Sequence, residues 1–107
     1  MVMTSSTLVS VVMSVYNAES SIDESILSLL NQTHENIEIL IMNDGSTDGT
    51  YEKLAEYEEK YSSIKIFENT KNIGLTKSLN ILINAAKGEF IARQDADDIS
   101  HPSRIFK

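Results

Sequence analysis

The sequence predicts an α/β domain in three layers, with a mainly parallel sheet between helices. Short apolar runs rich in β-branched residues alternate along the chain with longer segments whose apolar residues recur at helical spacing. Strands that alternate with helices in this way form right-handed βαβ units, and their strands are parallel. The chain has 107 residues, of which 41% are hydrophobic, and this is enough for one domain.

The first strand is predicted at residues 8–13, a continuous apolar run that is typical of a strand buried on both faces of a parallel sheet. A helix follows, for which Ser20 or Ser21 can serve as the N-cap, and it ends near Asn31. The buried face of this helix is predicted to carry Ile22, Ile26, Leu29 and Leu30.

The middle of the chain predicts a second strand at residues 37–42 and a short third strand at residues 64–67. After the second strand, residues 43–50 form a turn-rich loop, and the residues that follow the loop suit a half-buried helix. Within the loop, Ser46 and Asp48 are predicted to cap this helix.

The last third of the chain predicts a third helix and a fourth strand. Gly88 is placed to stop the helix, and the strand begins at Phe90. A polar loop at residues 95–100 follows, and Pro102 suits the first turn of another helix that starts near His101. The third helix is marked by apolar residues at helical spacing: Leu75, Leu79, Leu82, Ile83 and Ala86.

Polar loops follow three of the predicted strands, at residues 14–17, 43–49 and 95–98. The carboxyl ends of parallel strands meet at one edge of a sheet, and open α/β sheets bind their ligands beyond that edge. The sequence therefore predicts a ligand site where these three loops gather.

The net charge is −7, and all nine Lys and Arg residues lie after residue 52. This acidic balance does not suit a polyanion-binding surface, so we expect no nucleic-acid partner. The acidic half would also repel a phosphate ligand unless a divalent cation or a helix N-terminus intervenes. The chain has no cysteine, and no apolar run approaches the length of a membrane span. We expect a cytoplasmic location and leave membrane association open for a longer parent protein.

Several common phosphate and metal motifs do not fit the loops. Neither the dinucleotide fingerprint G-x-G-x-x-G nor a P-loop follows any predicted strand. An EF-hand loop that began at Asp44 would need a bidentate Glu where the chain has Ala55. A phosphoacceptor receiver domain would need an acidic pair directly after the first strand, where the chain has Ser14 to Asn17.

Four segments carry the remaining evidence: VSVVMSVYN at residues 9–17, IMNDGSTDG at 41–49, NIGLTKSLN at 72–80 and GEFIARQDADD at 88–98. In order and spacing they resemble the nucleotide-sugar half of family 2 glycosyltransferases, which have the GT-A fold, and the resemblance covers nearly the whole chain. It implies the strand order 3-2-1-4. It also implies inverting, metal-dependent transfer of a sugar from a nucleoside-diphosphate sugar, with a UDP-sugar expected, to a glycan acceptor, as in surface polysaccharide synthesis.

The resemblance implies that Tyr16 lies against the face of the donor's nucleobase and that Asp44 accepts a hydrogen bond from the base. A uracil imide N–H needs such an acceptor, and a carboxylate gives a charge-assisted bond. The family usually has Pro at the position of Ser14, whose hydroxyl here can bind the base or the ribose. Lys77 matches a position at which the family often has a basic residue facing the donor, where it could offset the diphosphate charge.

The stretch Asp95-Ala-Asp97, followed by Asp98, resembles the family's D-x-D metal motif. Hard cations such as Mn²⁺ and Mg²⁺ prefer carboxylate oxygens and share oxygens with diphosphates. We assign the metal to Asp97 and leave Asp95 and Asp98 shared between the metal and the donor's ribose, with a shift of one position still open. His34 and His101 have no His or Cys partner at ligand spacing, so we predict no metal role for them.

Family members are about twice this length or more, in line with ordinary domain sizes. We therefore expect residues 1–107 to form a single domain, the N-terminal donor-nucleotide-binding half of a longer enzyme. The catalytic base and the acceptor site are expected in the absent C-terminal half, so the chain alone should be inactive. An uncovered fourth strand should favour a homodimer, with Ile105 and Phe106 taking part.

Two other functions stay open on the residues alone. The chain could be a nucleotide-binding fragment without catalysis, or an α/β interaction domain that binds no nucleotide. Titration of UDP with and without Mn²⁺ would separate them from a metal-dependent donor site.

Overall fold

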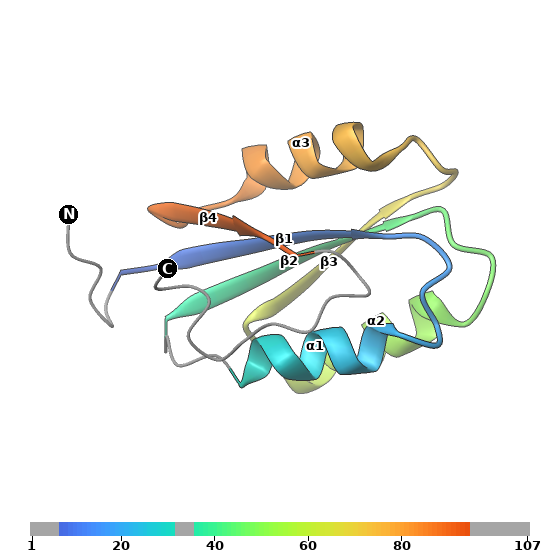
Figure 1. The fold of residues 1–107 in the computed structure, drawn as a ribbon, viewed down its shortest axis with the longest axis horizontal. Coiled ribbons are helices and arrows are strands. Elements are labelled where there is room, and N and C mark those ends of the chain that lie inside the picture. Colours follow the sequence, from blue (N-terminus) through green and yellow to red (C-terminus); the bar gives the residue numbers. More distant parts are fainter. Residues whose placement is uncertain (1–6, 32–35, 95–107) are drawn as a thin grey trace.

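The fold is built on one parallel sheet. The structure, a computed structural model, describes residues 7–31 and 36–94. The strands lie in the order β3-β2-β1-β4, and each neighbouring pair is parallel (Figure 1). The predicted strand order and the parallel sheet are therefore confirmed. The strands are β1 (Val9–Val15), β2 (Ile37–Asp44), β3 (Ile64–Asn69) and β4 (Phe90–Arg93).

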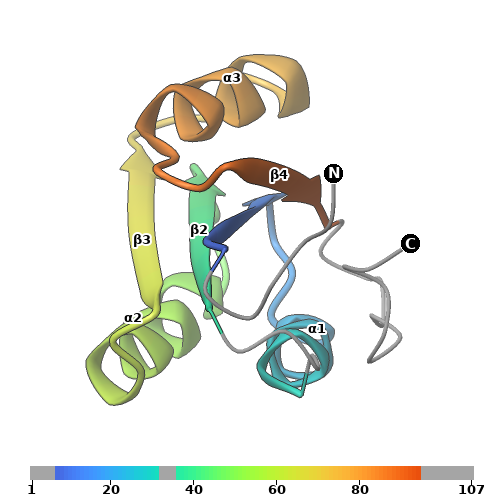
Figure 2. The same ribbon diagram turned by 90° about the vertical axis from the view of Figure 1, so that its left-hand side faces the viewer.

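Helices cover both faces of this sheet. α3 (Leu75–Ala85) lies on one face, whereas α1 (Ile22–Leu30) and α2 (Thr50–Lys60) lie on the other (Figure 2). α1 and α2 contact each other, and α3 contacts the central strands β1 and β2. The predicted three-layer architecture is confirmed.

The two central strands are buried on both faces. Val12 and Met13 point to opposite sides of β1, yet they are only 1% and 0% exposed. Met13 packs in a cluster with Ile26 of α1 and Leu54 of α2, and Val12 packs in a smaller cluster with Leu82 of α3. Burial on both faces explains why the first strand is a continuous apolar run rather than an alternating one.

Three strands extend beyond their predicted apolar runs. β1, β2 and β3 reach Val15, Asp44 and Asn69, whereas the sequence predicts ends two residues earlier in each case. The polar side chains do not interrupt the backbone ladder, because Asn43 lies opposite Glu68 and Asp44 lies opposite Asn69. Polar residues that look like loop residues in the sequence are therefore part of the sheet at its carboxyl edge.

The end of α3 also differs from the prediction. The helix ends at Ala85, and Ala86 already has an extended backbone, so Gly88 does not stop the helix. Gly88 instead lies against β1, where a Cβ atom would come within 2.6 Å of the backbone nitrogen of Ser10. The glycine is needed because the turn into β4 passes so close to β1.

Some predictions lie outside the described residues. These are the polar loop at residues 95–100, the helix near His101, and the dimer contacts of Ile105 and Phe106. Within residues 7–31 and 36–94, β4 forms one edge of the sheet. No helix in those two stretches is long and apolar enough to cross a membrane.

Candidate functional site

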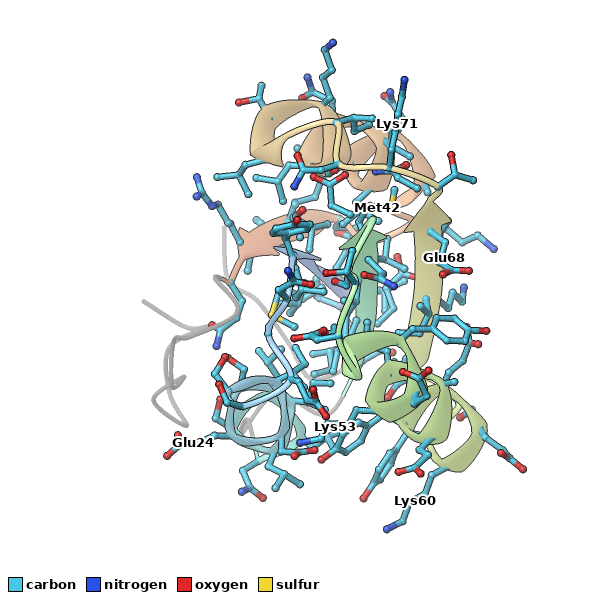
Figure 3. The ribbon with its side chains drawn as sticks, turned by 90° about the vertical axis from the view of Figure 1, so that its right-hand side faces the viewer. Glu24, Met42, Lys53, Lys60, Glu68 and Lys71 are labelled. Atoms are coloured by element: carbon cyan, nitrogen blue, oxygen red, sulfur yellow. The ribbon has the colours of Figure 1, made fainter. Side chains whose placement is uncertain are left out.

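The carboxyl ends of the parallel strands form one edge of the sheet, onto which Figure 3 looks. Ser14 lies near the end of β1, opposite Met42 of β2, and Tyr16 follows β1 directly. Asp44 is the last residue of β2. The structure thus places three of the predicted nucleotide-binding residues, Ser14, Tyr16 and Asp44, at neighbouring strand ends.

Tyr16 is 49% exposed at this edge. Asn17, the next residue, has a φ of 51°, in the left-handed region that Asn adopts more readily than most residues. Its Oδ1 accepts a hydrogen bond from the N–H of Thr47 at 2.7 Å, and its own N–H donates to Oγ of Ser46 at 3.0 Å. These bonds join the turn after β1 to the loop after β2 and fix the backbone beside Tyr16. The Ser46 hydroxyl, which was predicted to cap α2, serves this turn instead.

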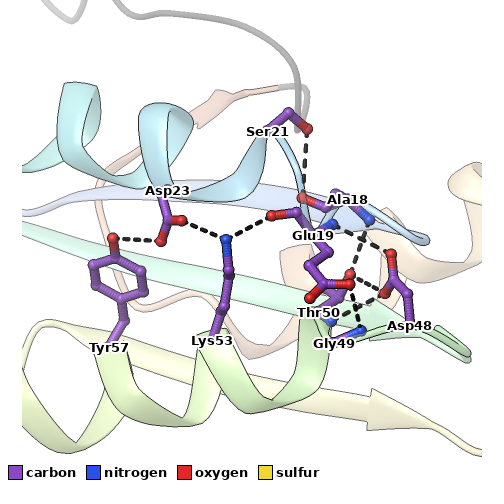
Figure 4. A network of polar contacts seen from close by, with 9 residues as sticks. All are labelled: Ala18, Glu19, Ser21, Asp23, Asp48, Gly49, Thr50, Lys53 and Tyr57. Atoms are coloured by element: carbon purple, nitrogen blue, oxygen red, sulfur yellow. Dashed lines mark hydrogen bonds and ion pairs between the residues drawn. The ribbon is translucent and has the colours of Figure 1, made fainter.

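Asp48 holds the start of α2, as predicted. Its Oδ1 accepts a hydrogen bond from the N–H of Thr50 at 3.0 Å, and the bond from the Thr50 hydroxyl lowers the pKa of the Asp48 carboxyl. The Thr50 hydroxyl also accepts a bond from the N–H of Ala18, and Glu19 accepts one from the N–H of Gly49 (Figure 4). The loops after β1 and β2 therefore form one connected unit next to the turn that carries Tyr16.

A second polar group joins α1 to α2. Lys53 Nζ lies 2.6 Å from Oδ2 of Asp23, and the Tyr57 hydroxyl donates to Oδ1 of Asp23 at 2.8 Å (Figure 4). The bond from Lys53 holds the pKa of the Asp23 carboxyl below its ordinary value. Burial, together with the bond to Asp23, raises the pKa of Tyr57 to about 12. Lys53 also donates to the backbone carbonyl of Glu19, so this group supports the loop that carries Tyr16.

Asp44 is the most enclosed of the predicted site residues that the structure describes, at 2% exposed. Its Oδ1 accepts hydrogen bonds from Nδ2 of Asn69 at 3.0 Å and from the N–H of Ile73 at 2.8 Å, and its Oδ2 accepts one from the N–H of Gly74 at 3.0 Å. Burial alone would raise the pKa of the Asp44 carboxyl, but these donors, with Ser78, hold the pKa below its ordinary value. The carboxylate therefore stays ionised at neutral pH although it is buried.

The sequence did not single out Asn69 or Ser78 as site residues. The predicted third strand stops at residue 67, whereas β3 continues to Asn69, directly opposite Asp44. Ser78 is fully buried in α3 and accepts a hydrogen bond from Nδ2 of Asn69 at 3.2 Å. The one indication in the sequence is that Ser78 interrupts an apolar helix face between Leu75 and Leu82.

The loops after β2 and β3 also approach each other closely. Gly45 has a φ of 76°, and a Cβ atom on it would lie 2.5 Å from the carbonyl carbon of Lys71. Lys71 and Glu68 border the same edge (Figure 3). Lys77 is exposed on the first turn of α3, the helix whose start is bonded to Asp44. The structure therefore places Lys77 one helical turn from the residues that Asp44 binds.

The predicted metal ligands Asp95, Asp97 and Asp98 lie outside the described residues. The last described residue, Gln94, is 1% exposed, and its N–H donates to the carbonyl of Val12 at 3.0 Å. β4 runs toward the same edge of the sheet, but it ends opposite Val12, three residues before the end of β1. Among the residues that the structure describes, no group of three or more His, Cys, Asp or Glu side chains could hold a metal ion.

Comparison with known proteins agrees with this architecture. The family model described as Glycosyl transferase family 2 matches residues 10–107. An uncharacterized glycosyltransferase of Haemophilus influenzae is 52% identical over 100 residues, which are 94% of this chain and 31% of the relative. The chain therefore spans about a third of the length of that relative.

Solved structures show the same fold. The crystal structure of S. aureus TarS 1-349 in complex with UDP has a TM-score of 0.83 and 30% identity, over 92% of this chain and 30% of that one. The mannosyltransferase PcManGT from Pyrobaculum calidifontis, in complex with GDP-Man and Mn²⁺, has a TM-score of 0.81 and 27% identity, over 90% of this chain and 29% of that one.

Proposed function

The chain belongs to glycosyl transferase family 2, and from this premise we propose that it forms the donor-binding part of a glycosyltransferase. The donor is a nucleoside-diphosphate sugar, with UDP as the expected nucleotide, and the acceptor is a glycan, as in the synthesis of a surface polysaccharide. Similar proteins in complex with UDP and with GDP-Man support this class of donor. We also propose that residues 1–107 are one domain of a longer enzyme.

The observation that carries the proposal is that the Asp44 carboxylate, whose pKa is held below its ordinary value, ends β2, while the exposed Tyr16 directly follows the neighbouring strand β1. A flat aromatic ring stacks on a nucleobase, and a carboxylate accepts a strong hydrogen bond from a base N–H. Uracil and guanine both carry a ring N–H that suits this acceptor. In this arrangement Tyr16 holds the face of the base, Asp44 its edge, and the Ser14 hydroxyl the base or the ribose.

We further propose that the diphosphate lies toward Lys77 and the acidic residues that follow β4. Asp97, with Asp95 and Asp98, offers only carboxylate oxygens, and this donor set fits Mn²⁺ or Mg²⁺. A cation held there would offset the negative charge of the diphosphate leaving group. Lys77 adds a positive charge on the α3 side.

In an inverting transfer, the acceptor hydroxyl attacks the anomeric carbon on the face opposite the nucleoside diphosphate, whose bond to the sugar breaks. The hydroxyl proton passes to a general base. We assign this base to no residue of the present chain. The chain's own residues hold the nucleotide and thereby orient the anomeric carbon.

The direct test is calorimetric titration of the protein with UDP, GDP, dTDP and CDP, each with and without Mn²⁺. We expect UDP to bind and Mn²⁺ to tighten it. By reciprocity, UDP should tighten Mn²⁺ by the same factor. If none of the four nucleotides binds, the proposal is contradicted and an interaction domain is favoured.

The variant Asp97→Asn tests metal binding separately from recognition of the nucleobase. The substitution keeps the size of the side chain but removes a charged oxygen ligand. We expect the Mn²⁺ enhancement of UDP binding to be abolished, while metal-free binding of uridine is unchanged. If the variant keeps the Mn²⁺ dependence of the native protein, the metal assignment to Asp97 is wrong and passes to Asp95 or Asp98.

A further inference from the structure

Two residues without an assigned role contact Asp44 from different elements. Asn69 comes from the end of β3, and Ser78 comes from the buried face of α3. The two amide hydrogens of Asn69 serve two acceptors, Oδ1 of Asp44 at 3.0 Å and Oγ of Ser78 at 3.2 Å. The three side chains therefore form one connected group, in which Asn69 is held between its two neighbours.

The buried polar side chains in this group need an explanation. Ser78 is fully buried and Asp44 is 2% exposed, and a buried polar group is unfavourable unless it is hydrogen-bonded. An apolar residue at position 78 would continue the face that Leu82 presents to the core. The hydroxyl is instead placed where it fixes the amide of Asn69.

We propose that Asn69 and Ser78 are positioning residues that orient the Asp44 carboxylate toward the nucleobase. This inference rests on the proposed function, in which Asp44 accepts a hydrogen bond from a ring N–H of the base. Neither residue needs to touch the nucleotide. Each acts by fixing the rotation of the carboxylate at the end of β2.

The allocation of oxygens explains how the orientation is set. The bonds from Asn69 and Ile73 use both acceptor directions of Oδ1. Oδ2 accepts a bond from Gly74, and a carboxylate oxygen has room for a second donor. Together with the bond from the Ser78 hydroxyl, these donors fix the plane of the carboxylate, and loss of the Asn69 bond lets it rotate away from a ligand N–H.

The test compares UDP with N3-methyl-UDP, which lacks the ring N–H. The ratio of their dissociation constants reports the close contact of the ring N–H with Asp44, because losses common to both ligands cancel. For the native protein we expect a ratio of roughly 10 or more, as for a hydrogen bond to a charged group. We expect Asn69→Ala and Ser78→Ala to lower the ratio, each by a factor of about 3 or more, within the range for a lost hydrogen bond.

Asn69→Asp gives the sharpest variant, since it keeps the shape of the side chain but places an oxygen where Nδ2 donates to Asp44. We expect its ratio to fall furthest. Ser10→Ala is the matched control, because it removes a buried hydroxyl at the opposite end of the sheet. This control should lower stability while leaving the ratio at the native value.

The experiment distinguishes failure of this inference from failure of the role proposed for Asp44. If the native ratio is high and all the Asn69 and Ser78 variants keep it, even with weaker binding of both ligands, the two residues are only structural and the inference is wrong. A native ratio near 1 would overturn the role proposed for Asp44 itself, and the inference with it. A thermal melt of each variant shows that the comparison is made on folded protein.

Discussion

The two ends of β2 each carry a buried carboxylate, and both bind backbone N–H groups at the limits of α3. Glu38, at the amino end, is 7% exposed and accepts a hydrogen bond from the N–H of Lys87, just after the helix. Asp44, at the carboxyl end, accepts bonds from the N–H groups of Ile73 and Gly74, just before it. One strand therefore holds both ends of one helix.

The two carboxylates differ in how their charge is balanced. Glu38 lies 3.5 Å from Nζ of Lys65, and it also accepts a bond from the Ser10 hydroxyl. The hydrogen-bond donors to Asp44 in the described part of the chain are all neutral: a side-chain amide, a hydroxyl and two backbone N–H groups. The charge of Glu38 is thus partly neutralised within the protein, whereas the charge of Asp44 is left to act on a ligand. This difference supports a structural role for the first end and the binding role that we propose for the second.

We expect the largest difference between the two ends of β2 in their effect on ligand affinity. Asp44→Asn should weaken uridine binding by about 1.5–3 kcal/mol, the range for a hydrogen bond to a charged group. Glu38→Gln should leave uridine affinity at the native value, because Glu38 lies at the opposite end of the strand. Calorimetry on both variants measures the difference. Equal losses in the two variants would remove the functional distinction between the ends.

Gly88→Ala tests how tightly the amino end is built. A Cβ atom at position 88 would lie 2.6 Å from the backbone nitrogen of Ser10, which cannot move aside without disturbing β1. We expect a loss of about 1–3 kcal/mol in the free energy of unfolding, as for other overpacked sites. Denaturant unfolding measures this loss.

Gly49→Ala is the matched control for that substitution. Its Cβ would meet the flexible carboxylate of Glu19 at 2.4 Å, and this side chain can move away. We expect a smaller loss in the free energy of unfolding than for Gly88→Ala. The reverse order would show that the turn into β4 is more adaptable than its close approach to β1 indicates.

Low pH should remove the stabilisation that the carboxylates at the two ends of β2 provide. Burial raises the pKa of Glu38 and of Asp44, but the hydrogen bonds that each accepts outweigh burial and hold each pKa below its ordinary value. Their stabilisation is therefore present above the unfolded pKa values, about 4, and is lost as pH falls through the lower folded values. Melting temperatures between pH 7 and pH 2.5 should fall less steeply in Glu38→Gln and Asp44→Asn. Curves parallel to that of the native protein would contradict this linkage.

The smallest effect is expected at the exposed ion pair between α1 and α2. The side chains of Lys53 and Asp23 are 33% and 48% exposed, so solvent screens their attraction. Lys53→Met should lower the free energy of unfolding by only about 0.2–1 kcal/mol. Thermal melts at low and high salt measure it. A larger loss would mean that this pair contributes as much as the buried carboxylates.

The sequence predicts the elements well because their buried residues form clear patterns, a continuous apolar run in a central strand and helical spacing in a helix. The apolar run around Val12 and Met13 indicates a central strand, and the spacing of Ile22 and Ile26 indicates a helix; the structure has both. The strand ends are less predictable, since polar residues such as Asn69 have the composition of a loop. Their place in the sheet depends on pairing with a neighbouring strand, which no local pattern records.

The candidate site, too, has one part that the sequence predicts and another that only the structure reveals. The positions of Tyr16 and Asp44 at one edge follow from parallel strands, so they could be predicted before the structure. The contact of Asn69 and Ser78 with Asp44 depends on the β2–β3 register and on the placement of α3. The capping role predicted for Ser46 fails for a similar reason, because its hydroxyl is taken by Asn17 from another loop.

The position of β1 between β2 and β4 has a consequence for synthesis of the chain. Val9 lies opposite Ile37 on one side but opposite Phe90 on the other, so one of its neighbours is translated much later. Until β4 has left the ribosome, one hydrogen-bonding edge of the most apolar strand has no sheet partner. Contacts between residues so far apart in sequence are the slowest to form. During translation, β1 therefore depends on β2 alone until the final strand of the described sheet is added.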